Sequence, residues 1–359
     1  MAEALVLFGG PSPEHDVSVH TGLQAARTLG AGEALYWTRA GDFVIVDASL
    51  EGKDFADGVP RGAKPARIAS GGGITVKGGM GREKTYDAVV VNCCHGGPGE
   101  DGTIQATLDL AGVAYTGPSV DGASLGMDKL AFGAVCAGAG IPVLPRVALL
   151  EGSKPDFDGP YIVKPRFGGS SIGIEVVADV DTAQALLQAN RHLGRGAVIE
   201  PYRPESIDLN VSVRAFPSLQ LSAIEKPTRA GSGAIYSYKE KYVGGEGMAT
   251  APRELPAQLP DALADKLRTY ARDAAQLAGV RGVARIDFLL DGDTLYLNEI
   301  NTIPGSLSWF LWVEPVVAFK TLLDDMIAEA VARPTAQYSS AGADGTVLRN
   351  SASIASKLA

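Results

Sequence analysis

The sequence reads VARIDFLLDGDTLYLNEINTIPG from Val283 to Gly305. Two apolar runs flank a tight Asp-Gly-Asp turn, which predicts a β-hairpin. Because side chains alternate between the faces of a strand, Arg285 and Asp287 share one face, and Glu299 and Asn301 share a face of the second strand. Asp287, Glu299 and Asn301 can therefore converge as three oxygen ligands, a set that suits Mg²⁺ held against phosphate. The alternative interpretation is a solvated polar face of an edge hairpin.

A second motif precedes this hairpin. The short apolar run from Tyr161 to Lys164 predicts a strand, and the loop Gly168-Gly169-Ser170-Ser171-Ile172-Gly173 follows it. Backbone N–H groups of such a loop can hold a phosphate, because glycine permits close approach and serine hydroxyls add donors. A flexible surface turn is the alternative for this loop.

The N-terminal part has the pattern of an α/β unit. An apolar run at residues 4–8 ends in Gly9-Gly10, and helical periodicity follows from Asp16 to Leu29. A second apolar run, residues 88–93, ends in the glycine-rich turn from His95 to Gly102. Both turns lie at the carboxyl ends of predicted strands, where open α/β sheets place their ligands.

The remaining elements are predicted from periodicity and from glycine and proline breakers. They are a surface hairpin at 70–81, helices at 103–110, about 122–139, about 261–277 and between about 315 and 332, and strands at 197–200, 209–216 and 219–226. The order predicts α/β and α+β architecture. Its parts are an N-terminal parallel-sheet α/β lobe (1–118), a small central lobe (119–203), a larger C-terminal lobe (204–336) and a tail (337–359).

Composition restricts the classes of function. The 44 glycines and 21 prolines in 359 residues stay below the ~25–30% of low-complexity chains. A net charge of −9 and a pI near 5.1 argue against a nucleic-acid or anionic-membrane surface. No signal peptide or spanning helix is visible. The three cysteines, Cys93, Cys94 and Cys136, are odd in number and lack metal-site spacing, which fits a reducing cytoplasm. Cys93 and Cys94, at the end of an apolar run, are expected to pack as small apolar residues.

Together the motifs resemble those of the D-alanine–D-alanine ligases of the ATP-grasp superfamily. The resemblance runs from about Leu5 to Trp312. The matching segments are 9–18, 95–102, 127–129, 164–173, 238–242, 285–287 and 298–305. The resemblance implies a three-lobed ATP-grasp fold. It also implies ATP-dependent ligation of two D-amino acids, with D-alanine as both, through an acyl-phosphate that releases ADP and phosphate.

The resemblance further implies which residues bind ATP and metal. Lys129 and Lys164 contact the ATP phosphates, Glu200 and Asp208 meet the adenine and ribose, and Lys241 contacts the γ-phosphate. The full implied ATP-binding set is Lys129, Lys164, Ser171, Glu200, Asp208 and Lys241. Asp287, Glu299 and Asn301 would hold two Mg²⁺ ions, with Mn²⁺ as a substitute.

The substrate-binding residues are implied in the same way. Glu14 would bind the ammonium group of the first substrate, linked through Ser170 and Tyr242. Arg285 and the Gly305 backbone N–H would form the oxyanion site. His95 would help to hold the first carboxylate and the loop behind it. The loop from Ile235 to Glu246 resembles a segment that closes over the ligands and excludes water.

One segment departs from the family pattern. After the Pro-Gly pair the family supplies a serine to the carboxylate of the second substrate, but Phe310 stands at that position here, between Trp309 and Trp312. This aromatic cluster either packs in the core or reshapes the acceptor pocket, to which Ser308 and Phe310 are assigned. Tyr242 favours an amine acceptor over a hydroxy acid.

Three function classes follow from these observations. The first is a cytoplasmic, homodimeric D-alanine–D-alanine ligase with small-molecule amino-acid substrates. The second is a related ATP-grasp ligase with a different acceptor, which Phe310 motivates. The third is a nucleotide-binding regulator without catalysis. The complete set Arg285, Asp287, Glu299 and Asn301 argues against the third class.

Overall fold

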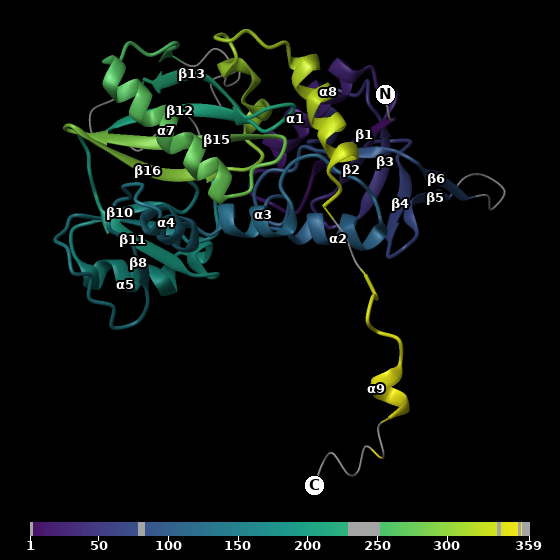
Figure 1. The fold of residues 1–359 in the computed structure, drawn as a ribbon, viewed down its shortest axis with the longest axis horizontal. Coiled ribbons are helices and arrows are strands. Elements are labelled where there is room, and N and C mark those ends of the chain that lie inside the picture. Colours follow the sequence, from purple (N-terminus) through teal and green to yellow (C-terminus); the bar gives the residue numbers. More distant parts are fainter. Residues whose placement is uncertain (1–2, 78–82, 229–251, 336–338, 351–352, 354–359) are drawn as a thin grey trace.

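The computed structural model describes residues 3–77, 83–228, 252–335, 339–350 and 353. Within them the chain forms three β-sheets, with helices packed around them (Figure 1). This organisation confirms the predicted α/β and α+β class. The C-terminal segment with α9 (Thr346–Arg349) projects away from the body (Figure 1). The lobe boundaries at residues 118, 203 and 336 stay predictions.

The N-terminal sheet has the strand order β6-β5-β4-β3-β2-β1-β7. Its strands are β1 (Ala4–Gly9), β2 (Glu33–Trp37), β3 (Phe43–Asp47), β4 (Lys64–Ala69), β5 (Gly73–Lys77), β6 (Glu83–Tyr86) and β7 (Val89–Asn92). Strands β2, β1 and β7 are parallel, whereas the others pair antiparallel. The predicted parallel sheet is therefore a mixed one. Short turns return a strand antiparallel, and a parallel pair needs a crossover such as α1 (His15–Leu29).

Helices cover this sheet and fill its core. They are α1, η1 (Gly52–Phe55), α2 (Thr103–Ala111) and α8 (Phe319–Ala332). Val6 and Phe8 of β1 share a buried cluster with Leu323 and Met326 of α8. The last helix of the body thus returns to the N-terminal sheet, where it lies beside α1 (Figure 1).

The central sheet is small and wholly antiparallel, in the order β10-β9-β11-β8. Its elements are β8 (Val147–Leu149), β9 (Tyr161–Pro165), β10 (Glu175–Val177), α5 (Val180–Ala189), η3 (Arg191–Leu193) and β11 (Ala197–Pro201). Ala183 of α5 packs on Val163 and Ile199 of the sheet. Strand β9 thereby carries Lys164 toward the neighbouring sheet.

The third sheet has the order β14-β13-β12-β15-β16. Its elements are β12 (Ile207–Arg214), β13 (Gln220–Pro227), β14 (Arg253–Glu254), α7 (Asp261–Leu277), β15 (Val283–Asp291) and β16 (Thr294–Asn301). The predicted hairpin is confirmed as the β15–β16 pair. Leu209 and Val211 of β12 pack in one cluster with Leu267 of α7. The opposite face of the sheet contacts η4 (Gly305–Leu311).

The predicted helix over residues 122–139 is wrong in one respect. It is two helices, α3 (Val120–Met127) and α4 (Lys129–Gly138), separated by Asp128 in an extended conformation. The Asp128 side chain accepts hydrogen bonds from the backbone N–H groups of Leu130 and Ala131, so it caps α4. Helix α4 therefore begins at Lys129, directly after the capping residue Asp128.

The cysteines and the helix lengths bear on two expectations from the sequence, the packing of the thiols and the lack of a membrane-spanning helix. Cys93, Cys94 and Cys136 are free and buried, which confirms the core packing predicted for Cys93 and Cys94. Burial raises the pKa of the Cys93 thiol to about 12. In the described part of the chain no helix is long and apolar enough to cross a membrane.

Candidate active site

A cavity lies between the central and third sheets and reaches the N-terminal sheet. Thirteen residues assigned from the sequence line it: Glu14, His95, Lys129, Lys164, Ser170, Ser171, Glu200, Asp208, Arg285, Asp287, Glu299, Asn301 and Gly305. They come from positions almost 300 residues apart. Lys241, Tyr242 and the loop 235–246 lie outside the described residues.

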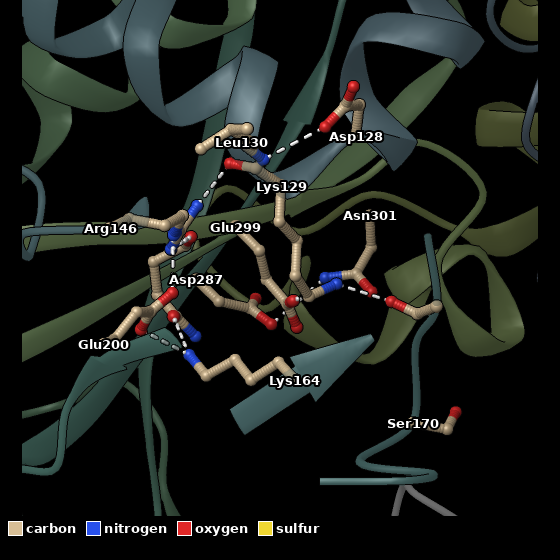
Figure 2. A network of polar contacts seen from close by, with 12 residues as sticks. Asp128, Lys129, Leu130, Arg146, Lys164, Ser170, Glu200, Asp287, Glu299 and Asn301 are labelled. Atoms are coloured by element: carbon tan, nitrogen blue, oxygen red, sulfur yellow. Dashed lines mark hydrogen bonds and ion pairs between the residues drawn. The ribbon is translucent and has the colours of Figure 1, made fainter. Parts of the chain in front are cut away.

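Glu200 is the most deeply buried charge of the cavity, with no exposed surface. Lys164 Nζ donates to its Oε2 at 2.8 Å, and Arg146 Nε donates to its Oε1 (Figure 2). Burial pushes the pKa of Glu200 up, but the charges of Arg146 and Lys164 outweigh it and hold the pKa below its ordinary value. Glu200 therefore fixes two cations. No motif in the sequence pointed to Arg146.

Lys129 approaches the cavity from the first turn of α4. Its Nζ lies 3.0 Å from Glu299 Oε2 and donates to the Gly168 carbonyl (Figure 2). The Arg166 guanidinium pairs with Asp128 and helps to hold the pKa of that carboxyl below its ordinary value, against the opposing effect of burial. The capped helix end and the glycine loop thus orient Lys129 toward the hairpin. Lys129 and Lys164 line the same cavity, where both can neutralise phosphate charge.

The hairpin carboxylates face the cavity as predicted. Arg285 donates to both oxygens of Asp287 at 2.7 Å, and Asn301 Nδ2 donates to Asp287 Oδ2 at 3.1 Å. Glu299 lies directly opposite Asp287 in the strand register. The side chains of Arg285 and Asp287 are 10% and 14% exposed, so the interpretation as a solvated edge is wrong.

These residues fit a magnesium site. Two carboxylates and an amide oxygen are the hard ligands that Mg²⁺ prefers. Among the described residues no group of three or more His, Cys, Asp or Glu gathers to hold a metal. The Asn301 amide is therefore needed to complete the set with Asp287 and Glu299.

The charged residues on this side of the cavity are referred to below by one name. We call Lys129, Lys164, Glu200, Asp287 and Glu299, with Arg146, the ion-pair wall.

The glycine-serine loop closes on Glu14, so it is not a surface turn. The Ser170 hydroxyl donates to Glu14 Oε1, and Ser170 is buried. Ser170 and Ser171 adopt left-handed φ values of 52° and 59°. Gly96 has a φ of 70°, and a Cβ there would lie 2.6 Å from Glu14 Oε2. Strained backbone and a missing side chain together give the Glu14 carboxylate its place.

His95 is buried and holds the segment that leads into η4. Its Nδ1 donates to the Ile303 carbonyl at 2.7 Å, and its Nε2 lies 2.8 Å from the Thr21 hydroxyl. The Thr21 hydroxyl in turn accepts from the Ser306 N–H at 3.1 Å. Burial lowers the pKa of His95 to about 4, so the imidazole is neutral and has one donor and one acceptor.

Glu100, in the turn that follows His95, was not singled out from the sequence. It accepts from the Gly96 N–H at 2.7 Å and from the Ile303 N–H at 2.8 Å, and it lines the cavity. Burial and the nearby Glu14 charge raise its pKa to about 8. It lies within the quoted segment 95–102, so the signal was present. Glu100 ties the glycine turn to the segment before Gly305.

Two assigned acceptor residues, Ser308 and Phe310, are not among the described residues that line the cavity. Ser308 is fully buried, and its hydroxyl lies 2.7 Å from the Ser212 hydroxyl. Trp312 donates to the same Ser212 hydroxyl and belongs to the N-terminal core cluster, so core packing is correct for this tryptophan. Phe310 instead packs under Arg253, a cavity residue that the sequence did not reveal.

Comparison with known proteins gives one family over most of the chain. A family model described as "D-ala D-ala ligase N-terminus" matches residues 3–118, and one described as "D-ala D-ala ligase C-terminus" matches residues 144–328. A D-alanine–D-alanine ligase of Bradyrhizobium sp. (strain ORS 278) is 32% identical over 353 residues, which cover 91% of this chain and 95% of that protein.

Solved structures agree in fold. The D-alanine–D-alanine ligase of Helicobacter pylori matches with a TM-score of 0.74 at 26% identity, covering 91% of this chain and 99% of that one. The D-alanyl-alanine synthetase A of Vibrio cholerae O1 matches with a TM-score of 0.76 at 23% identity, covering 93% and 100%. The latter likeness shows the fold alone.

Proposed function

The chain belongs to the D-alanine–D-alanine ligase family of ATP-dependent, ADP-forming ligases, and on this premise we propose that it joins two D-alanine molecules. In the proposed reaction the first carboxylate takes the γ-phosphoryl group of ATP. The amine of the second amino acid then attacks the acyl carbon, and phosphate leaves. A free carboxylate is a poor electrophile, so phosphorylation supplies the leaving group and the protein supplies positioning and charge stabilisation.

The observation that carries this proposal is the composition of a single cavity. It brings Lys129, Lys164 and the hairpin carboxylates to the same space as the Glu14–Ser170 contact. The two lysines supply cations for phosphate oxygens, and Asp208 lies in the wall available to the ribose. Asp287, Glu299 and Asn301 would hold two Mg²⁺ ions, which neutralise phosphate charge when bound.

The remaining assigned residues act on the amino acids. Glu14, held by Ser170, receives the ammonium group of the first substrate. Arg285 and the Gly305 N–H stabilise the negative charge that develops on the carboxyl oxygen. His95 and Glu100 both hydrogen-bond Ile303 and thereby position Gly305. We assign Tyr242 to the link with Glu14, and Lys241 to the γ-phosphate.

The test is a substrate panel with product mass measurement. Purified protein, ATP and Mg²⁺ are given D-alanine alone and then pairs of D- and L-amino acids, while phosphate release and product masses are followed. We expect D-alanyl-D-alanine with one ADP and one phosphate per dipeptide. Phosphate release without a dipeptide, or no turnover with any amino acid, would contradict the proposal.

A related ligase with a different acceptor is the second candidate. The observation in its favour is the position of Phe310 beneath Arg253, with the Ser308 hydroxyl buried against Ser212. In the same panel this candidate requires turnover when D-alanine is combined with another amino acid, and little turnover with D-alanine alone. The residues assigned to ATP and to the first amino acid are the same for both candidates.

We further propose that the enzyme acts as a homodimer in the cytoplasm. Three free, buried thiols suit a reducing compartment. Light scattering on the eluted protein tests the dimer, and fractionation of the source cells tests the compartment. A monomer at micromolar concentration would contradict the first part of this proposal.

A further inference from the structure

Arg253 reaches into the cavity from β14, at the edge of the third sheet opposite β16. Its side chain is 11% exposed, and Nη1 donates to Glu225 Oε1 at 2.7 Å. The guanidinium carbon lies 4.6 Å from the centre of the Phe310 ring. An aromatic face on one side and a buried carboxylate on the other hold the guanidinium in one orientation.

Glu225, the partner of Arg253, and the candidate metal ligands Asp287 and Glu299 belong to one row of side chains that crosses the sheet. In the strand register Glu225 pairs with Asn210, Asn210 with Asp287, and Asp287 with Glu299. Asn210 Nδ2 also donates to Glu225 Oε2 at 3.0 Å. Because neighbouring strands lie ~5 Å apart, Glu225 is about 10 Å from Asp287 across the sheet. All four residues of the row, and Arg253, line the cavity.

The other cations of the described cavity wall are committed elsewhere. Lys129 and Lys164 pair with Glu299 and Glu200 in the ion-pair wall, and Arg285 donates to both carboxylate oxygens of Asp287. Arg203 lies at the rim, 47% exposed and 3.4 Å from Asp291. The Ser308 hydroxyl of η4, assigned to the acceptor from the sequence, is buried against Ser212. A carboxylate entering between Asp287 and Glu225 therefore meets Arg253.

We infer that Arg253, oriented by Phe310 and Glu225, binds the α-carboxylate of the acceptor amino acid and selects acceptors that carry one. This inference rests on the proposed ligase function. A guanidinium presents its donors in a planar fork that matches a carboxylate, and one guanidinium can serve two carboxylates at once. An acceptor without this charge leaves a mostly buried cation with one anionic partner fewer, and it is therefore rejected.

The experiment is a competition between two acceptors in one tube. The acceptor identified by the substrate panel and its α-amide are mixed at equal concentration with D-alanine, ATP and Mg²⁺. Mass spectrometry then gives the ratio of the dipeptide to the dipeptide amide. This ratio is internal to each reaction, so it does not depend on the amount of folded enzyme. We expect the wild type to favour the carboxylate about 10- to 100-fold.

Arg253→Gln and Arg253→Lys test the residue, and Arg214→Gln is the matched control. Arg214 is 12% exposed, donates to Asp325 at 2.7 Å and lies 5.4 Å from the Trp312 ring centre. It does not line the cavity in the described structure. The expected product ratio falls to within a few-fold of one for Arg253→Gln, is intermediate for Arg253→Lys, and is unchanged for Arg214→Gln.

The outcomes separate the two proposals. If the wild type makes no dipeptide at all, the proposed function is wrong and the inference is lost with it. If the wild type is active and Arg253→Gln keeps the wild-type ratio, the inference alone is overturned. Loss of both products in Arg253→Gln, with a thermal unfolding midpoint near that of the wild type, also overturns it, because Arg253 would then serve the reaction and not the choice of acceptor.

Discussion

The ion-pair wall and the Arg253 end of the cavity hold their charges by different means. In the ion-pair wall, Glu200 and Glu299 pair with Lys164 and Lys129 from separate elements. At the other end, a single cation pairs with Glu225 and rests on an aromatic ring. The first arrangement suits a highly charged ligand such as a nucleoside triphosphate. The second suits one carboxylate, and we propose that the two ends bind different ligands.

The largest expected difference concerns Asp287, because its carboxylate is a proposed metal ligand in the ion-pair wall. Asp287→Asn should lower kcat/KM on the order of 10²- to 10³-fold, since a preorganised charge at the reacting group is lost. The matched control is Asp291→Asn on the same hairpin, whose carboxylate lies 3.4 Å from Arg203 at the rim. Steady-state phosphate release measures both. Equal effects of the two variants would contradict the metal assignment.

Next in size is the stability held in the buried pairs. Arg146→Gln leaves Glu200 with one cation in a site without solvent exposure, so we expect the free energy of unfolding to fall by about 3 kcal/mol. Arg27→Gln removes an ion pair with Glu51, whose partners are 46% and 62% exposed, and should cost less than ~1 kcal/mol. Urea denaturation measures both, and similar losses would remove the distinction between buried and exposed pairs.

A smaller effect concerns Glu100, whose carboxyl accepts hydrogen bonds from the backbone N–H groups of Gly96 and Ile303. Its pKa rises from 4.5 to about 8 in the folded protein, so folding retains a proton that the unfolded chain releases. This stabilisation is complete below pH 4.5 and is lost as pH rises through about 8. A glutamine amide does not titrate, so the free energy of unfolding of Glu100→Gln should rise relative to that of the wild type by more than ~1 kcal/mol between pH 5 and pH 8. A pH-independent difference in unfolding free energy would contradict the shift.

The smallest expected effect concerns the aromatic support of Arg253. Phe310→Leu keeps an apolar side chain but removes the ring face, so the acceptor ratio defined above should fall by about 3-fold. Phe216→Leu is the control, because the Arg333 guanidinium carbon lies 5.6 Å from the Phe216 ring centre away from the cavity residues. A ratio unchanged by Phe310→Leu would show that Glu225 orients Arg253 without the ring.

Local motifs predicted the elements that carry the ion-pair wall. The Asp-Gly-Asp turn gave the β15–β16 hairpin, and alternation placed Asp287 and Arg285 on one face, where they form an ion pair. The break at Asp128 was missed because residues on both sides of it have helical periodicity. The parallel sheet was overstated because the antiparallel strands β3, β4 and β6 were not among the predicted strands.

The Arg253 end could not be predicted in the same way. Arg253 and Phe310 are far apart in the sequence, and neither carries a motif that names the other. Ser308 looked suited to a substrate because of its residue type and position. Packing of η4 on the third sheet instead turns its hydroxyl to Ser212. Arg146, which fixes Glu200 from 54 positions away, shows the same limit.

The sequence by itself determined the β15–β16 hairpin, strands such as β1, β7 and β9, and the chemistry of the charged residues, because these follow from side-chain period and residue type. The tertiary structure decided which charges are partners, which hydroxyl is buried and which cation reaches the acceptor side. Those contacts join residues such as Glu14 and Ser170, 156 positions apart, and they form because three sheets pack around one cavity. Packing between distant elements, which no local pattern encodes, set these neighbours.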